Sequence, residues 1–413
     1  MLNWAKQFSI HIFLDNNNYP TSLNGYECLL AAGVSEGHNG TSKQTLEDLQ
    51  QLHEWGKDWI FGHICYDYKN VIEKKLSSQH TLKTSFPNLH FFIPKVVCYI
   101  NREQDSFTIA SFNDPAIIYR EIMNEKPALT NTLPHLTFTR NIDKHQYIDV
   151  IKKLREHIGD GDCYEINFCS MGYCRNANVE PVTVFNALNK LSPSPFAAYY
   201  KFYGQYMMCA SPERYLKKEG SKLLSQPIKG TAKRSPDKNE DNEIKELLRN
   251  NLKERAENVM IADLVRNDLA KTCQPGSIQA EELFAVYTYP QVHHLISTIT
   301  GQLLPGTAFT EAIKQSFPMG SMTGAPKYKV MQLIEQYEAS RRELFSGTIG
   351  YITPDGDFDF NVVIRSLFYN TLTNFLYYQT GGAITFDSIP EMEWEEMRLK
   401  AWALERIFDG ERE

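Results

Sequence analysis

The chain has 413 residues, 42% of them hydrophobic and 23% charged, which suits one large or two medium globular domains. Its formal net charge of -7 argues against a nucleic-acid-binding protein, because neutralising phosphates requires clustered lysine and arginine. No apolar run approaches the roughly 18 residues of a membrane span, and the N-terminus lacks the pattern of a secretory signal. We therefore expect a cytoplasmic protein that binds neither nucleic acid nor a membrane.

Eight cysteines are spread along the chain, and none belongs to a Cys-x-x-Cys pair. A long chain without a secretory signal favours reduced thiols over disulfides. No group of cysteines and histidines has the spacing of a zinc site. We expect free, mostly structural thiols.

The first third of the chain alternates short apolar runs with polar turns. The runs Trp59–Tyr68 and His90–Ile100 predict buried strands. The stretch Asn124–Phe138 is rich in turn-forming residues and is a plausible crossing between two parts of the protein. We therefore expect an N-terminal lobe over residues 1–135 and a larger region over residues 136–413, intertwined in one globular unit.

Strand and helix patterns are mixed in the rest of the chain. Residues 143–162 predict a helix that Gly159 and Gly161 end. The later elements that we expect are a strand over Cys163–Tyr173, helical structure over residues 239–271, strands within residues 345–386 with a turn at Pro354–Gly356, and a helix over Glu391–Phe408. This order favours hairpins over regular βαβ units, and therefore an α+β class.

The stretch Gln226–Lys233, QPIKGTAK, surrounds a lysine with residues that constrain the backbone. Pro227 fixes the chain on one side of Lys229, and Gly230 permits a turn on the other. A solvated lysine does not need such flanks, so this one is a candidate for a defined position in a site.

Two predicted helices carry glutamates beside their apolar faces. Glu257 lies at the edge of the apolar stripe of one helix. In the last helix, Glu393 and Glu396 share a stripe with Lys400, and two carboxylates one turn apart repel unless a cation or substrate group lies between them. Mg²⁺ could be that cation, because it prefers oxygen ligands and is often held by only one or two protein carboxylates. The alternative is a pair of ordinary solvated helices in which Lys400 neutralises Glu396.

Four further stretches are unusual, although each signal is weak by itself. Glu213 follows a proline after an apolar run. Two histidines at 293–294 head an apolar run, where a histidine is more often a core residue than a catalyst. Thr323 is a candidate helix cap with Pro326 in the first turn, and such a helix start favours an anion. Residues 379–388 predict a small-residue loop that a ligand can approach closely.

Taken together and in this order, these stretches resemble the chorismate-utilising enzymes, which include anthranilate synthase component I, aminodeoxychorismate synthase component I and the isochorismate and salicylate synthases. The motifs are SPER, PIKGT, ERAENVMIADLVRNDL, VHHLIST, GSMTGAPK, GTIGY, VIRS, TGGAITFDS and EEMRLKA. The resemblance implies an α+β fold in which two packed antiparallel sheets enclose the active site, with helices outside. It also implies that residues 136–413 form the chorismate-binding catalytic region.

Lys229 distinguishes among the members of this family, because anthranilate synthases have alanine at its position. The lysine resembles that of aminodeoxychorismate synthase component I, a Mg²⁺-dependent, transaminase-class enzyme of p-aminobenzoate and folate biosynthesis. The resemblance implies that Lys229 adds to C2 of chorismate while the C4 hydroxyl leaves, and that ammonia then displaces it to give 4-amino-4-deoxychorismate. The sequence has no Gly-x-Cys-x-Gly glutaminase motif. We expect no glutaminase domain, and ammonia from a separate glutamine amidotransferase.

The resemblance assigns roles to other residues as well. Glu213 matches the general acid, which burial must keep protonated, and His294 matches a histidine near the reacting ring. Glu257 and Glu396, with Glu393 beside them, match the ligands of Mg²⁺. The positions that match substrate contacts are Arg365, Gly230, Thr231, Thr323, Phe345, Gly381, Gly382 and Ala383.

A lysine attacks only as the neutral amine, so its pKa must fall. We expect burial to lower the pKa of Lys229, helped by the neighbouring cations Lys233 and Arg234.

The chain departs from the family pattern at three places. Glu165 stands where relatives more often have glutamine and where water-adding isochorismate synthases have a lysine. Ala383 replaces a usual glycine. The family's tryptophan site shows a serine after a Leu-Leu pair, whereas residues 29–33 read LLAAG, with Pro195–Ala197 as the second half of the pocket. We therefore do not expect tryptophan to bind. Two alternatives stay open, namely an anthranilate synthase component I and a non-catalytic chorismate-binding subunit.

Overall fold

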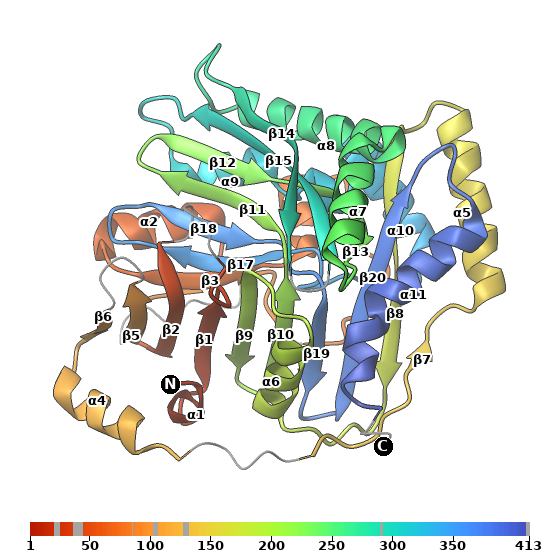
Figure 1. The fold of residues 1–413 in the computed structure, drawn as a ribbon. Helices are drawn as coiled ribbons and strands as arrows, with labels where there is room; N and C mark the ends of the chain where they lie inside the picture. The colour runs from red at the N-terminus through yellow and green to blue at the C-terminus, as the bar shows by residue number, and fades with distance from the viewer. Residues whose placement is uncertain are drawn as a thin grey trace.

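A computed structural model describes residues 1–19, 25–35, 44–84, 86–101, 106–126, 132–289 and 292–409. Within these residues the chain folds into two antiparallel sheets with helices around them (Figure 1). This is the α+β architecture expected from the sequence.

The first sheet has eleven strands among the described residues. In spatial order they are β16 (Gly324–Ala325), β8 (Glu165–Cys174), β20 (Phe375–Ile384), β19 (Ser366–Asn370), β10 (Gln205–Ser211), β9 (Phe196–Phe202), β1 (Ile10–Asp15), β2 (Tyr26–Val34), β5 (Pro94–Asn101) and β6 (Ser106–Ser111), with β7 (Thr139–Arg140) beside β8. The N-terminal strand β1 pairs with β9, so the early and late parts of the chain share this sheet.

The second sheet has nine strands in the described part of the chain. Their order is β13 (Ile228–Lys233), β15 (Val292–Gln302), β12 (Lys222–Gln226), β11 (Arg214–Glu219), β18 (Phe358–Asn361), β17 (Thr348–Ile352), β3 (Ile60–Ile64) and β4 (Leu89–Phe92), with β14 (Gln279–Thr288) also paired to β15. Here β3 pairs with β17, which again joins the two ends of the sequence. The division at residue 135 stays a prediction.

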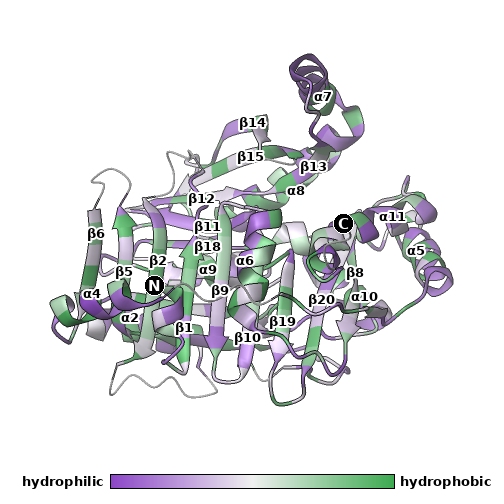
Figure 2. Ribbon diagram, turned by 60° about the horizontal axis from the view of Figure 1, so that its bottom comes forward, coloured by the Kyte–Doolittle hydropathy of each residue, from purple (hydrophilic) through white to green (hydrophobic). Residues whose placement is uncertain are grey.

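The helices lie outside the sheets (Figure 1). The described helices are α1 (Leu2–Ala5), α2 (Leu46–Gly56), α3 (Lys69–Ile72), α4 (Pro115–Asn124), α5 (Lys144–Gly159), α6 (Pro181–Leu191), α7 (Lys238–Asn250), α8 (Leu252–Ala270), α9 (Phe309–Ser316), α10 (Lys327–Tyr337) and α11 (Pro390–Arg406), with 3-10 turns at Tyr66–Tyr68 and Gly320–Met322. Helix α8 packs on β13 and β15, and α11 packs on β20. Helix α7, which is largely hydrophilic, projects from the body (Figure 2).

Local sequence explains where the helices near the site begin. Asp143 and Gln146 form a capping box at the start of α5. The Asn251 side chain accepts the Glu254 N–H and separates α7 from α8. Pro390 occupies the first turn of α11, where a missing N–H costs nothing.

Apolar side chains of both sheets meet in one large core. Ile12 and Phe368 reach it from the first sheet, and Phe61 and Phe360 reach it from the second, all at most 1% exposed. All eight cysteines are free, as predicted. None of the helices within the described ranges has the length and hydropathy of a membrane span.

Several predicted elements differ from the structure in instructive ways. The apolar run His90–Ile100 is two strands, because β4 ends at Phe92 and β5 begins at Pro94 in the other sheet. The strand predicted over Trp59–Tyr68 ends at Ile64 and continues as a 3-10 turn. Residues 379–384 belong to strand β20, so the predicted small-residue loop is wrong in its first half.

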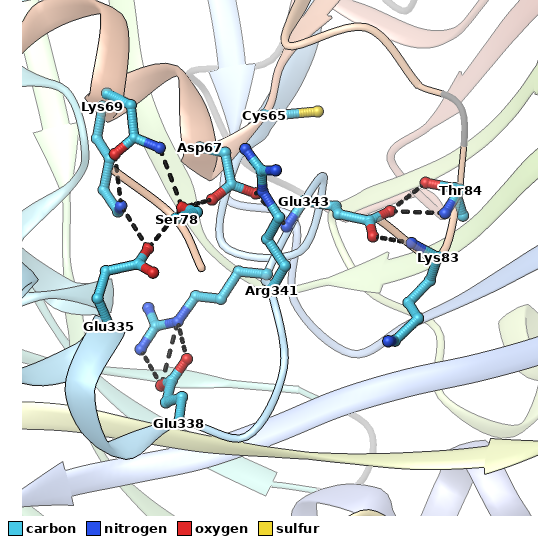
Figure 3. Close-up of polar contacts among 12 residues, drawn as sticks. Cys65, Asp67, Lys69, Ser78, Lys83, Thr84, Glu335, Glu338, Arg341 and Glu343 are labelled. Atoms are coloured by element: carbon cyan, nitrogen blue, oxygen red, sulfur yellow. Dashed lines mark hydrogen bonds and ion pairs between the residues drawn. The ribbon is translucent and has the colours of Figure 1, made fainter. Parts of the chain in front are cut away.

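A buried polar network ties the N-terminal segment to α10 and the chain that follows it (Figure 3). Lys69 Nζ lies 2.7 Å from Glu335 Oε1, and Arg341 pairs with Asp67. The Glu343 carboxylate accepts the N–H groups of residues 83 and 84. Since a buried charge is costly unless it is paired, these contacts fix how the two segments meet.

Candidate active site

Lys229 lies on β13 at an irregularity in its pairing with β15. The register shifts between Ile228 and Thr231, which is the mark of a β-bulge. Gly230 has a φ of +93°, and a Cβ there would lie 3.0 Å from Glu254 Oε2 and 3.2 Å from Leu295 Cβ. The turn expected from Gly230 is therefore confirmed, and it leaves Lys229 only 9% exposed.

The Lys229 ammonium is paired with a carboxylate of the other sheet. Its Nζ lies 2.5 Å from Oε1 of Glu165, the first residue of β8, which is 1% exposed. Burial acts to lower the pKa of Lys229, but the nearby carboxylates of Glu165, Glu257 and Glu213 raise it above its ordinary value. The predicted fall of this pKa is therefore wrong for the protein without substrate.

The two cations expected to lower that pKa point elsewhere. Lys233 is exposed. Arg234 forms an ion pair with Asp241, at 2.8 Å between Nη2 and Oδ2. The charges that face Lys229 are thus acidic, which the neighbouring sequence did not reveal.

Glu213 lies between β10 and β11 and is 5% exposed. Burial raises its pKa to about 7, against a hydrogen bond from Ser321 and the charge of Lys229, which lower it. A carboxyl with this pKa carries its proton for about half the time at neutral pH and can give it to a leaving group. The burial expected of this residue is confirmed.

His294 on β15 joins two other predicted site residues. Its Nδ1 lies 2.8 Å from Thr231 Oγ1, and Arg365 Nη2 lies 3.3 Å from its Nε2. Burial, followed by the charge of Arg365, lowers the pKa of His294 well below its ordinary value. The imidazole is therefore neutral. Because the guanidinium can only donate, Nε2 is the acceptor and Nδ1 carries the proton.

Four carboxylates from two helices surround the same region. Burial raises the pKa of Glu257 to about 7 and also raises the pKa values of Glu254 and Glu393. Lys400 Nζ lies 2.7 Å from Glu396 Oε1, and its charge lowers the pKa of that carboxyl. The ion pair in which Lys400 neutralises Glu396, which the sequence offered as an alternative to a metal site, is therefore present. Burial outweighs the nearby lysine charges at three of the four acids, although Lys253 Nζ lies 3.8 Å from Glu257 Oε1.

Gly382 lets β20 pass close to the glutamates of α11. A Cβ there would lie 3.4 Å from Glu393 Oε2 and 3.5 Å from Glu396 Oε1. Within the described ranges, no three Asp, Glu, His or Cys side chains are already arranged to hold a metal ion. The four glutamates nevertheless offer carboxylate oxygens, the donor type that a hard divalent cation takes.

The other predicted contact positions lie on strands of the first sheet or in the core. Gly381 pairs with Cys169, and any Cβ would lie 2.2 Å from the Phe168 carbonyl oxygen. Ala383 pairs with Asn167 on the same two strands. Phe345 is 2% exposed and belongs to the core.

Thr323 is fully buried, and its hydroxyl donates to the Met319 carbonyl. Helix α10 begins later, at Lys327, with Pro326 at its N-cap position. The predicted helix cap is therefore wrong, because the turn before the helix takes up the threonine.

Three residues with no assigned role lie at the site. Glu165 was visible in the sequence only as a departure from a family pattern. Ser321, which bonds to Glu213, lies inside the motif GSMTGAPK. Glu254 lies one turn before Glu257, with the same spacing that marks Glu393 and Glu396. That repeated spacing could have identified it.

A separate cavity of about 60 Å³ lies where β1, β2 and the start of β9 meet. Pro195–Ala197 line it, as expected for one half of the tryptophan pocket. Leu14–Asn16, Gly25–Leu29 and residues of β17 and β18 form the rest of the lining, and Leu29 is the one residue of the stretch 29–33 among them. The pairing of Asp15 of β1 with Ala197 of β9 brings two of these segments together. That tryptophan does not bind stays a prediction.

Comparison with known proteins gives the family. Residues 18–406 match the family described as chorismate binding enzyme. The chain belongs to this family.

Several relatives carry more specific names. It is 32% identical over 363 residues to aminodeoxychorismate synthase component 1 of Bacillus subtilis, covering 84% of this chain and 76% of that protein. It is 36% identical over 256 residues to the protein of that name from Escherichia coli, covering 62% and 56%. It is 32% identical over 302 residues to anthranilate synthase component 1 of Aquifex aeolicus, covering 73% and 59%. The match thus spans between about half and three quarters of these relatives.

Solved structures share the fold. Anthranilate synthase component I from Streptococcus pneumoniae superposes with a TM-score of 0.78 at 23% identity, covering 97% of this chain and 91% of that one. MenF, the menaquinone-specific isochorismate synthase of Escherichia coli, gives 0.76 at 20% identity, covering 98% and 90%. The fold expected from the sequence is confirmed.

Proposed function

We propose that this chain is the synthase component that converts chorismate and ammonia into 4-amino-4-deoxychorismate. The observation that carries the proposal is a buried lysine held on a β-bulge, close to a buried glutamic acid whose pKa is about 7. A nucleophile and an acid are the two groups that this substitution needs. The names of the relatives from Bacillus subtilis and Escherichia coli support the same reaction.

The first half of the proposed reaction makes a bond between Lys229 and the ring. The Nζ lone pair attacks C2 of chorismate, the two ring double bonds shift toward C4, and the C4–O bond breaks. Glu213 gives its proton to the departing oxygen, which leaves as water. The rigid bulge keeps the amine aimed at the ring carbon, and orientation of this kind supplies a large part of enzymatic rate.

The second half reverses the electron shift. Ammonia forms a bond to C4, the double bonds return, and the C2–N bond to Lys229 breaks. The new C4 ammonium gives one proton back to Glu213, which restores the acid. Arg365 offers a planar fork for a substrate carboxylate, and neutral His294 accepts from Arg365 and so holds that fork in place.

We further propose a Mg²⁺ requirement. The ion would be held by the side chains of Glu254, Glu257, Glu393 and Glu396. When bound, it would supply positive charge to a substrate carboxylate and would stabilise the negative charge that develops as the C4–O bond breaks. On binding the ion, these glutamates would lose their protons and turn their oxygens toward it. Lys400, now paired with Glu396, is positioned to exchange this partner for another acceptor.

Ammonia would come from a separate glutamine amidotransferase, as the word component in the relatives' names suggests. The cytoplasmic location expected from the sequence stays a prediction.

The test is to incubate the protein with chorismate, Mg²⁺ and ammonium and to identify the product by mass spectrometry. We expect 4-amino-4-deoxychorismate from the wild type and none from Lys229→Ala. A matched control is Lys233→Ala, an exposed lysine of the same strand that should leave turnover unchanged. Anthranilate as the product would refute the assignment, and unchanged product formation by Lys229→Ala would refute the covalent role.

A further inference from the structure

We propose that Glu165 is a catalytic residue of this site, and that it takes the proton that Lys229 must lose before it can attack. This inference rests on the proposed nucleophilic role of Lys229 and adds the group that activates it.

The geometry provides one direct proton path. Glu165 Oε1 lies 2.5 Å from Lys229 Nζ, and both side chains are buried, at 1% and 9% exposure. The second oxygen, Oε2, is buried and accepts no hydrogen bond from any described residue. A carboxylate with one oxygen on the ammonium and the other free can take up a proton without breaking another contact.

The main chain that carries Glu165 is held in place. Its strand begins in a tight pairing with β16, where Glu165 is opposite Ala325. The Tyr164 N–H donates to the Ala325 carbonyl at 2.8 Å. A Cβ on Gly324 would lie 2.0 Å from the Glu165 carbonyl oxygen, so this close approach requires glycine. The pairing with β16 therefore fixes the strand position from which the carboxylate extends.

The electrostatic surroundings explain why a proton acceptor is needed. Carboxyl groups from several elements act on Lys229, namely Glu165 of β8, Glu213 before β11, Glu254 and Glu257 of α8, and Glu396 of α11. They raise the pKa of Lys229 despite its burial. The lysine is thus an ammonium at neutral pH and has no lone pair for attack. Other charged groups near these acids are Glu393, Lys253, Lys400 and Arg365.

The proton balance closes over one turnover. One proton moves from Lys229 Nζ to Glu165, which leaves a neutral amine beside a neutral carboxylic acid. The amine attacks C2 and becomes a secondary ammonium. When ammonia at C4 expels it, Lys229 departs as the neutral amine and takes its proton back from Glu165. No oxidant or further reactant is required.

Two measurements on Glu165→Gln test the inference. The first is turnover of chorismate with ammonium as a function of pH. We expect kcat at pH 7 to fall by about 100-fold, typical of a lost acid-base group, and to recover as pH rises and water removes the lysine proton. The second is carbamylation of Lys229 by cyanate, read on the peptide by mass spectrometry. Cyanate also reacts only with the neutral amine, so if Glu165 takes the lysine proton, labelling at pH 7 should fall together with kcat and recover over the same pH range.

A fall in both turnover and labelling is the signature of a proton acceptor. A merely structural ion pair predicts faster labelling together with unchanged or faster turnover, and that result would overturn the proposal. Unchanged labelling would also overturn it, since the pair would then not exist in solution. Glu165→Asp keeps a base one methylene farther away, and we expect a smaller loss of kcat with the wild-type pH profile. If Asp and Gln behave alike, the inference is wrong.

The outcome is separable from the proposed function. An inactive Lys229→Ala beside a fully active Glu165→Gln would remove the proton acceptor and leave the function standing. Product formation by Lys229→Ala would remove the covalent mechanism itself.

Discussion

The burial of Glu213 predicts that replacing it with glutamine stabilises the protein at alkaline pH while abolishing activity. Burial raises the pKa of Glu213 from 4.5 to about 7. The folded state therefore holds a proton that the unfolded chain releases within this window. The stability that this group contributes is complete below about pH 4.5 and is lost as pH rises through about 7.

The size of the effect follows from the same two values. The gap between 4.5 and about 7, at about 1.4 kcal/mol per pH unit, is about 3 kcal/mol. Glutamine has nearly the same shape and no charge to bury. The free energy of unfolding of Glu213→Gln relative to the wild type should thus rise by about 2 to 3 kcal/mol between pH 5 and pH 8.5.

The assay is urea unfolding at pH 5 and pH 8.5, with kcat measured in parallel. Activity should fall by about 100-fold or more because the acid is gone. Glu395→Gln, on the exposed face of α11, is the matched control, with an effect on unfolding within about 0.5 kcal/mol. A Glu213→Gln variant that is equally destabilised at both pH values would refute the reasoning.

Three further predictions concern the backbone, the buried network and the metal. Gly230→Ala should cost about 1 to 2 kcal/mol of stability and at least about tenfold in kcat, because its φ of +93° is strained for alanine and the bulge aims Lys229. Gly220→Ala, also at positive φ but in open space, should lose stability alone, and equal losses of kcat would contradict the role of the bulge. Glu338→Gln should lower the free energy of unfolding by about 3 to 5 kcal/mol, because it leaves Arg342 buried without its ionic partner. Urea titration measures this change, and a loss below about 1 kcal/mol would contradict the prediction. Removal of divalent cations with a chelator should stop chorismate consumption, which Mg²⁺ should restore, and full activity in the chelator would exclude the proposed ion.

Local sequence was sufficient for most elements near the site. The helix Lys144–Gly159 was expected from its pattern and its terminal glycines. The one-residue break at Asn251 was missed in the helical segment 239–271. Strand β8 was expected within one or two residues of its bounds. These elements follow local rules of periodicity and capping, which a single sequence displays.

Features that depend on tertiary contacts were not predictable in the same way. His90–Ile100 is one apolar run, but its halves belong to different sheets, because Pro94 begins a strand paired with β2. The charge state of Lys229 was expected from Lys233 and Arg234, which are near in sequence. It is set instead by Glu165, 64 positions away. Which carboxylate faces an amine is decided by sheet packing, and periodicity carries no information about it.

The central claim is that Lys229 becomes covalently bound to the ring. The most direct measurement is to quench the protein with chorismate and Mg²⁺ in the absence of ammonium and to determine the mass of the peptide that contains residue 229. We predict a mass increase equal to chorismate less one water on that lysine, removed when ammonium is added before quenching. A peptide of unchanged mass, in protein that forms 4-amino-4-deoxychorismate once ammonium is supplied, would contradict the claim.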